Sequence, residues 1–273
     1  ERRREIMKGE GILTDQLITN EFKTYSSRWW MLGIFSYLSI TNAMMWITFA
    51  PISDDTSDYF GGIGITAVNF LAIVFQIGYG PGTLLGVIAM KKYDLRGTLL
   101  IGGTLTFIGS LLRVAAALLK DHIGNYGCYA LMLFGQIFAA LAGPMYNSLP
   151  PALAAAWFSI SERDIATAVG SLFNPLGNAA GQILPPIFVT ENDEGTVSGM
   201  IPLMIVESII IASSLLLAVI FFKSAPPTPP SYSTHLRNAG VDIYSSIDSG
   251  DEEGGWKRLK REYKLLMENK NYV

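Results

Sequence analysis

The stretch Gln136-Ile-Phe-Ala-Ala-Leu-Ala-Gly-Pro-Met-Tyr-Asn147 opens the part of the sequence that decides the fold, and this part continues to Pro186. It contains two apolar runs, each long enough to cross a bilayer, separated by a short charged turn at residues 162–164. Both runs are rich in glycine, proline and amide side chains. A membrane helix tolerates these residues mainly where neighbouring helices or a watery cavity satisfy its backbone. We therefore expect both helices to face protein or a cavity rather than lipid.

The composition of the whole chain indicates a polytopic membrane protein. Half of the 273 residues are hydrophobic and only 16% are charged, which is unlike a soluble domain. The net charge is −3 and the basic residues stand in short blocks, which argues against nucleic acid as a partner. Cys128 is the only cysteine, so the chain forms no internal disulfide and offers no cysteine cluster for zinc. We expect no cofactor and no metal site.

Six apolar runs reach the roughly 20 residues that a membrane-spanning helix needs. They cover residues 29–51, 67–90, 98–119, 128–151, 165–189 and 200–222, and we expect the fourth to continue to Trp157. The first run is of full spanning length and lacks a small-residue cleavage site, so it indicates a retained helix rather than a signal peptide. The sequence thus predicts an all-α fold with a tail at 1–28, a six-helix bundle at 29–222 and a linker at 223–273.

The distribution of lysine and arginine predicts the orientation in the lipid bilayer. Basic residues concentrate in the tail, in the loop at 91–96 and after residue 222, whereas the first, third and fifth loops together hold only Lys120. By the positive-inside rule both ends of this chain are cytoplasmic. We expect a plasma membrane or endolysosomal location.

The segment after the sixth run changes character. Residues 231–249 are polar and predict a mobile linker, and residues 256–267 form a basic amphipathic pattern. That pattern suits a helix on the inner leaflet, or equally a solvated helix that leads into a further membrane span. A six-helix bundle with a long cytoplasmic linker resembles the first half of a larger protein, so we expect the chain to be a fragment.

Two ionisable residues lie inside the predicted spans. Arg113 stands about six residues from the outer end of the third helix and Glu207 about seven from that of the sixth, which is the same depth on a 1.5 Å rise. An unpaired charge there costs at least ~2.5 kcal/mol, so we expect the two to form an intramembrane ion pair. Such a pair favours a scaffold role, and the alternative is that Glu207 binds a proton or cation.

Amide and aromatic side chains form two stripes at helical spacing. On the fourth helix the stripe is Gln136, Ala140, Gly143 and Asn147, and on the first helix it is Phe35, Ser39, Asn42, Trp46 and Phe49. A few polar groups in an aromatic wall are typical of a solute cavity. Amides also join membrane helices by hydrogen bonds, which is the alternative for each residue taken alone.

The fifth helix has a narrow face of small residues. Gly170, Asn174, Gly177 and Gly181 lie on it and Pro175 opens the helix beside it, and residues 78–86 give the second helix a similar character. Small residues let two backbones approach closely, so we expect a partner helix that slides or rocks against this face.

At these residues the chain resembles the major facilitator superfamily and, within it, the feline leukaemia virus subgroup C receptor-related family, also called solute carrier family 49. The similar motifs are Arg28-Trp-Trp, Asn42-Ala-Met-Met-Trp-Ile-Thr-Phe-Ala-Pro-Ile52, Leu95-Arg96, Leu112-Arg113, Gly135-Gln136, Trp157-Phe158, Glu162-Arg163, Ala166-Thr167, Asn174-Pro-Leu-Gly177 and Lys270-Asn-Tyr-Val273. The resemblance implies that this chain is the N-terminal half of a twelve-helix transporter. Its substrate site would lie between two six-helix halves, the second of which is missing here, and it would work by alternating access.

The resemblance also implies roles for particular residues. Trp46 matches an aromatic residue that lines the solute cage of the family, and a glutamine of some members falls at Gly143, whereas Gln136 is a different position. The superfamily loop after the second helix has Asp where Lys91 stands and Gly where Asp94 stands. The expected cavity residues are Trp46, Asn42, Gln136, Gly143, Tyr146 and Asn147. The expected gating or domain-interface residues are Lys91, Asp94, Arg96, Gly170, Asn174, Pro175, Gly177 and Gly181.

These features favour a transporter of a small organic solute. A choline- or ethanolamine-like cation is preferred to haem, because aromatic faces hold ammonium groups without a carboxylate, while haem iron usually takes ligands such as His or Cys. The only histidines, His122 and His235, fall in predicted loops. The alternative is a non-transporting receptor or a truncated regulatory half-transporter. An enzyme is disfavoured, because no span carries a Ser-His, Cys-His or metal-ligand set, and we assign no catalytic residue.

Overall fold

The computed structural model describes residues 23–191, 197–231 and 234. The chain divides into two units, residues 1–230 and 231–273, and the first contains every element described below. Most of the tail at 1–28, the whole amphipathic segment 256–267 and most of the linker lie outside the described residues.

In the described residues every regular element is a helix apart from one short β ribbon, so the expected all-α fold is confirmed. In chain order the helices are α2 (Ser27–Ile47), α3 (Ser53–Tyr59), α4 (Ile65–Leu118), α5 (Lys120–Ser148), α6 (Pro150–Trp157), the single 3₁₀ turn η1 (Ile160–Glu162), α7 (Arg163–Ile183), α8 (Pro185–Phe188) and α9 (Met200–Phe221). The ribbon pairs β1 (Thr190–Glu191) with β2 (Val197–Ser198) in antiparallel fashion, and Thr190 stands opposite Ser198.

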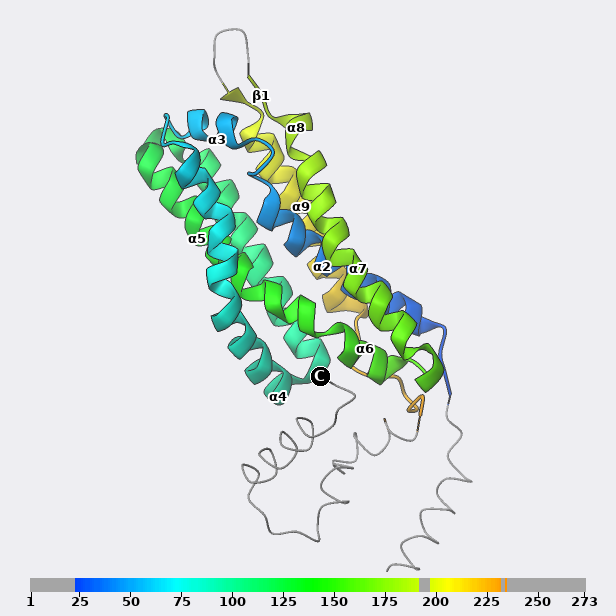
Figure 1. Ribbon diagram of the computed structural model, residues 1–273. Coiled ribbons are helices and arrows are strands. Elements are labelled where there is room, and N and C mark those ends of the chain that lie inside the picture. The colour runs from blue at the N-terminus through cyan, green and yellow to red at the C-terminus, as the bar shows by residue number, and fades with distance from the viewer. Residues whose placement is uncertain (1–22, 192–196, 232–233, 235–273) are drawn as a thin grey trace, which may run out of the picture. The chain divides into compact units, whose positions relative to one another are not determined.

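Helix α4 is two helices joined without a loop. Its backbone breaks at Asp94, where φ is 57° and ψ is −168°, so residues 65–93 and 95–118 form two arms, each long enough to cross a bilayer. Figure 1 shows these arms, cyan to teal, running side by side and meeting at the lower end of the bundle. A second break at Gly124, with φ of 70°, turns the chain at the start of α5.

Prolines set the ends of the fourth and fifth helices. The fourth was expected to continue to Trp157, and it does so in two pieces, since α5 ends at Ser148 and α6 runs from Pro150 to Trp157. The fifth was expected to reach Val189, but α7 ends at Ile183 and the short α8 begins at Pro185. Helical structure thus reaches Trp157 and Phe188, close to the expected ends, but it is interrupted at Leu149 and Leu184, because the paired prolines 150–151 and 185–186 have no N–H to continue the helical ladder.

Among the described helices, α2, α4, α5 and α9 are long and apolar enough to cross a membrane. Helix α7 has 21 residues but is less apolar, since it begins with Arg163 and Asp164 and carries Asn174 and Asn178. The two arms of α4 together with α2, α5, α7 and α9 correspond to the six runs read from the sequence.

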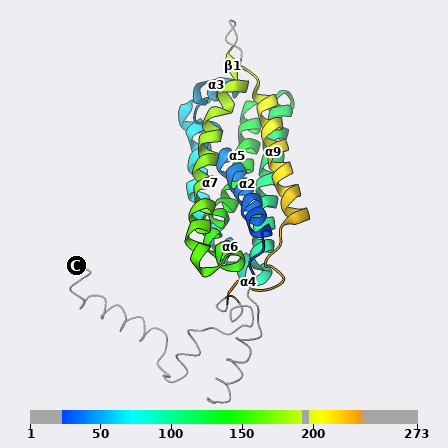
Figure 2. The ribbon, with the colours of Figure 1, turned by 90° about the vertical axis from the view of Figure 1, so that its right-hand side faces the viewer.

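Glycines allow two pairs of helices to pack closely. Gly78 and Gly82 of α4 lie against α5, where an added Cβ would come within 2.7 Å of the Ala140 Cβ and 2.6 Å of the Leu141 carbonyl oxygen. Gly177 and Gly181 of α7 lie in the same way against α2. Figure 2 shows α2 between α7 and α9, so α2 is enclosed on both sides.

Candidate functional site

A cavity of about 160 Å³ opens between α2, α4, α5 and α7. Complete small-molecule sites commonly measure ~300–1,000 Å³, so this volume suits part of a site rather than a whole one. Its lining consists of Asn42, Ala43 and Trp46 from α2; Phe75, Gln76 and Tyr79 from α4; Ala140, Gly143, Pro144 and Asn147 from α5; and Asn174 from α7. No carboxylate, amine or guanidinium lines it among the described residues.

Trp46 is fixed in the wall of this cavity. Its indole Nε1 donates a hydrogen bond of 3.1 Å to the carbonyl oxygen of Ala72 in α4. Its ring lies tilted against Phe75, with 6.4 Å between the centroids. Since the N–H is bound to the backbone, the indole presents apolar and π surface to the cavity rather than a free donor.

Asn42 lies one helical turn before Trp46 and is held by two elements. Its side-chain amide nitrogen donates to the Thr106 hydroxyl oxygen of α4 at 3.1 Å and to the Ala139 carbonyl oxygen of α5 at 2.9 Å. Asn42 is only 2% exposed, although it is one of the residues that line the cavity.

Four of the six expected cavity residues meet in the structure: Trp46, Asn42, Gly143 and Asn147 line the cavity. The other two, Gln136 and Tyr146, do not. The cavity face of α5 follows 140, 143, 144 and 147, so Tyr146 points away and Gln136 lies one turn deeper.

The contacts of Gln136 and Tyr146 explain their positions. The amide nitrogen of Gln136 lies 3.4 Å from the Met45 carbonyl oxygen and 3.3 Å from that of Leu71, so it joins α5 to α2 and α4. This is the interhelical role that amides have in membranes. Tyr146 is buried beside Phe35, with 6.5 Å between the ring centroids.

Sequence reasoning missed Phe75, Gln76 and Tyr79, which form the α4 wall. They stand at i, i+1 and i+4 and carry the mixture of amide and aromatic side chains that marked the other two helices. The glycines at 78–86 instead led to the prediction that this helix serves close packing against another helix. The amide and aromatic spacing rule, applied to this helix as well, would have found them.

The expected gating residues fall into separate places. Gly170, Gly177 and Gly181 pack on α2 within the same bundle, whereas Asn174 lines the cavity and Pro175 is exposed. The partner of this glycine face is thus α2.

The loop residues Lys91, Asp94 and Arg96 lie at the break of α4. Arg96 joins this break to the end of α9, because its guanidinium donates to the Val219 carbonyl oxygen at 2.8 Å and its backbone N–H donates to the Ser224 hydroxyl at 3.2 Å. Asp94 carries the break itself, and its φ of 57° is the positive value that a glycine adopts readily. Lys91 is exposed.

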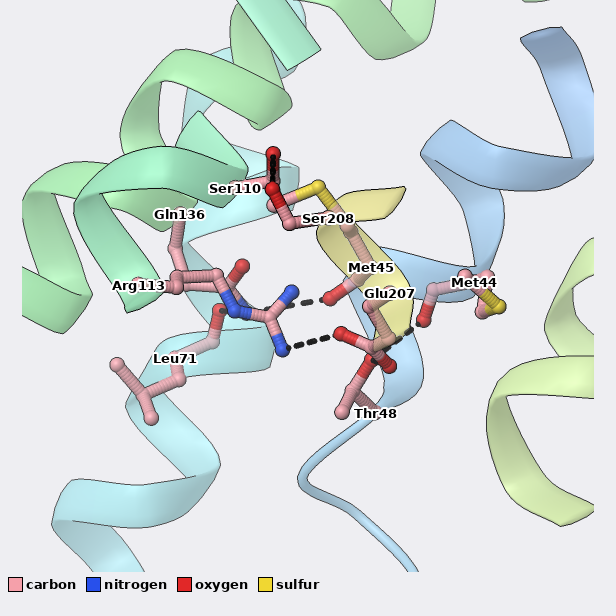
Figure 3. Close-up of polar contacts among 9 residues, drawn as sticks. All are labelled: Met44, Met45, Thr48, Leu71, Ser110, Arg113, Gln136, Glu207 and Ser208. Carbon is pink, nitrogen blue, oxygen red and sulfur yellow. Dashed lines mark hydrogen bonds and ion pairs between the residues drawn. The ribbon is translucent and has the colours of Figure 1, made fainter. Parts of the chain in front are cut away.

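Arg113 and Glu207 form a buried ion pair outside the cavity lining (Figure 3). The Nη2 of Arg113 lies 2.9 Å from Oε2 of Glu207, and the two side chains are 1% and 2% exposed. Thr48 of the α2–α3 connection donates to Oε1 of Glu207 at 2.8 Å, and the Phe49 ring lies 4.7 Å from the guanidinium carbon. These contacts join α4 and α9 to the end of α2.

The chain is similar to known proteins of one family. The family model described as Major Facilitator Superfamily matches residues 29–266. Solute carrier family 49 member A3 of Xenopus tropicalis is 32% identical over 236 residues, which cover 82% of this chain and 47% of that protein. The protein of the same name from Danio rerio is 28% identical over 244 residues, covering 84% of this chain and 50% of that protein.

A further relative is the choline/ethanolamine transporter FLVCR1 of Mus musculus, which is 29% identical over 175 residues, or 63% of this chain and 30% of that protein. The chain therefore spans about half the length, or less, of the curated relatives it matches.

Proposed function

Because the chain belongs to the Major Facilitator Superfamily, we propose that it forms the first six-helix half of a transporter that moves a small organic solute across a membrane by alternating access. The observation that carries this proposal is the cavity between α2, α4, α5 and α7, which is lined by three aromatic residues and several amides and, among the described residues, by no charged side chain. A second six-helix half would supply the facing wall. The volume of about 160 Å³ fits a site that is completed from another side.

The solute class that this lining favours is a choline- or ethanolamine-like cation. An ammonium over an indole face gains roughly 0.5–2 kcal/mol per ring without any carboxylate, and Trp46 and Phe75 offer two rings. Relatives of this chain carry the name choline/ethanolamine transporter. Haem is less suitable. His, Cys, Met and Tyr commonly ligate haem iron, and in the described part of the chain Tyr79 is the one such residue that lines the cavity.

The proposed orientation has both ends of this chain in the cytoplasm. The basic residues Arg28, Arg96, Arg163 and Lys223 gather at the end of the bundle where α2 begins, α4 breaks and α9 finishes (Figure 1). Lys120 lies at the other end, with its Nζ 3.8 Å from the Tyr59 ring centroid. By the positive-inside rule the first end faces the cytoplasm, in a plasma membrane or an endolysosomal membrane.

The test is uptake and efflux of radiolabelled choline and ethanolamine by vesicles that hold the protein made from its complete coding sequence. Trp46→Ala should abolish saturable flux, and Trp46→Phe should retain part of it because a ring remains. Trp30→Ala is the matched control, since Trp30 stands on the same helix but is 55% exposed and outside the cavity lining.

Equal flux in native protein and Trp46→Ala would refute the proposed cavity. No flux in either direction from correctly inserted native protein would refute the choline-like solute, and would favour a non-transporting receptor or a regulatory half-transporter instead.

A further inference from the structure

Residues 223–230, called the strap below, follow α9 at the end of the bundle where α2 begins (Figure 1). They form neither a helix nor a strand. The backbone of Lys223 holds the start of the strap, because its N–H donates to Sδ of Met31 at 3.3 Å and its carbonyl oxygen accepts from the indole of Trp157 at 3.2 Å. Prolines follow at 226, 227, 229 and 230, and none of them has an N–H to enter a helix or a sheet. The strap therefore has no regular structure that a binding partner would first have to unfold.

Thr228 stands between the two pairs of prolines. In the 273 residues of the sequence it is the only serine or threonine that is followed directly by proline. The following proline disfavours the α region for Thr228 and directs it to an extended or polyproline conformation. Protein kinases take up their substrates in extended form, and one class of serine/threonine kinase selects a proline directly after the acceptor residue. The sequence and the local structure at Thr228 thus agree with the requirements of this class.

The hydroxyl of Thr228 lies beside the segment that precedes α2. Its Oγ1 atom is 2.9 Å from the phenol oxygen of Tyr25, and both residues are partly exposed. Either group can donate in this hydrogen bond. Because the bond joins two neutral groups that water reaches, water replaces it readily when Thr228 enters a kinase.

The charged groups on this side of the strap are basic. The Nζ atom of Lys23 lies 5.6 Å from the centroid of the Tyr25 ring, and residues 23–28 include no acidic side chain. Arg28 is already paired with Glu162 at 2.8 Å. Among the described residues no carboxylate pairs with Lys23, so its ammonium is the cation available to a new anion at Thr228.

We propose that Thr228 is a phosphorylation site for a proline-directed serine/threonine kinase, and that the phosphate strengthens the contact between the strap and the segment before α2. In the transfer, Oγ1 of Thr228 bonds to the γ-phosphorus of ATP, the bond from that phosphorus to the β–γ bridging oxygen breaks, and ADP leaves. The hydroxyl proton passes to the catalytic carboxylate of the kinase. The phosphate then accepts a hydrogen bond from the Tyr25 phenol and pairs with the ammonium of Lys23. The inference goes beyond transport and rests on the cytoplasmic orientation proposed above, because kinases and ATP act on that side.

The first experiment maps the acceptor residue. Protein made from its complete coding sequence is incubated in detergent with a proline-directed kinase and ATP, and its phosphopeptides are identified by mass spectrometry. Thr228 should carry the phosphate. Pro229→Ala keeps the hydroxyl and should lose the modification, whereas the matched control Pro227→Ala should retain it. An unmodified Thr228 in the native protein, or equal modification of the two proline variants, overturns the site.

The second experiment measures what the phosphate does. The amide hydrogens of Arg28 and Trp29 bond to the carbonyl oxygens of Tyr25 and Ser26 at 3.1 and 3.3 Å, so their exchange with solvent reports on this segment. Phosphorylation should slow their exchange about tenfold, which is the value of one charge-assisted hydrogen bond. Lys23→Gln should still be phosphorylated but should lose most of this slowing. Unchanged or faster exchange in the phosphorylated native protein overturns the strengthened contact.

Sealed vesicles separate a failure of this inference from a failure of the proposed transport. Kinase and ATP added to inside-out vesicles, whose outer surface is the cytoplasmic face, should modify Thr228. Right-side-out vesicles should show the modification only after detergent opens them. Modification from the extracellular face alone overturns the proposed orientation and this inference together, and it leaves the cavity and its solute class to be decided by the flux measurements.

Discussion

Substitution of Arg113 and Glu207 is the most direct test of whether their ion pair stabilises this bundle. Arg113→Met and Glu207→Leu each leave one charge in a place where the native side chains are 1% and 2% exposed. Removing a single partner of a buried pair commonly costs about 3–5 kcal/mol, because the remaining charge has lost its counterion. The double variant Arg113→Met/Glu207→Leu leaves neither charge behind. We expect it to lie within about 1 kcal/mol of the native protein, or above it.

The surroundings of the pair support this expectation for the double variant. Thr48 loses its bond to Glu207, but the Met44 carbonyl oxygen also lies 2.8 Å from its hydroxyl, so the hydroxyl hydrogen turns to that acceptor and stays satisfied. The Phe49 ring, which lies 4.7 Å from the guanidinium carbon, can pack on a methionine instead. The coupling energy between the two sites is therefore expected to be about 4 kcal/mol or more. It is large because each single variant is much less stable than the native protein.

The assay is equilibrium unfolding in mixed micelles titrated with a denaturing detergent, for the native protein, both single variants and the double variant. A control cycle uses Arg28→Met and Glu162→Leu, whose ion pair of 2.8 Å has side chains 16% and 33% exposed. Its coupling should stay below about 1 kcal/mol, because water screens both charges. The scaffold role of the pair would be refuted if the single variants at Arg113 and Glu207 each lost under about 1 kcal/mol of stability. It would also be refuted if the double variant lost as much stability as the two single variants together. A double variant that is stable but has lost transport would favour Glu207 as a proton or cation site.

Three further predictions follow from the backbone and from one tyrosine. Asp94→Gly should raise stability by about 1–2 kcal/mol and hence the apparent melting temperature, because a non-glycine residue at φ 57° and ψ −168° is strained; an unchanged or lower value would contradict this. Gly177→Ala should cost about 1–3 kcal/mol, because the new Cβ would meet Ala43 and the backbone of Ile40, whereas Gly33→Ala, which meets nothing within 4 Å, should not destabilise. Burial raises the pKa of Tyr59 in α3 to about 12, with Cys128 and Asp121 adding to the effect. The unfolded chain therefore ionises first, and stability present below pH 10 should fall as the pH rises toward 12, by up to about 3 kcal/mol. Melting curves at pH 8.5–11.5 should show this fall in the native protein and a weaker one in Tyr59→Phe.

Helix existence was predictable from apolar length, and helix ends were not. The turn between the second and third runs was predicted at residues 91–96, but its reduction to a single residue, Asp94, was not, because aspartate rarely adopts this backbone conformation. Pro150 and Pro185 did mark ends, but the continuous hydrophobicity around them outweighed that signal in the expected bounds. The length and hydropathy of a run show that it can cross the membrane, whereas the residue at which a helix ends depends on whether single backbone N–H groups are present to continue its hydrogen bonds.

The candidate site was predictable in part, because helical periodicity fixes a face but not its neighbour. The spacing placed Asn42 and Trp46 on one face of α2 and Gly143 and Asn147 on one face of α5, and these faces do meet. It could not decide that Gln136, on the same stripe, lies a turn too deep and binds the backbone of two other helices. The spacing of residues along a helix predicts which way their side chains point. Where a cavity opens between two helices depends on how those helices cross, which the spacing does not give.

Helix α2 explains why the cavity wall is a fixed surface of this bundle. On one side α7 packs its glycines against the backbone of α2, and at its end Thr48 binds Glu207 of α9. Toward the cavity, Asn42 and Trp46 are bonded to α4 and α5. The sequence suggested that the glycine face serves a sliding partner, but a helix held by α4, α5, α7 and α9 at once cannot slide past one of them without breaking its bonds to the rest. The contacts therefore favour movement of this bundle as one body, so the alternating access proposed above would come from motion against the proposed second half rather than from motion within this bundle.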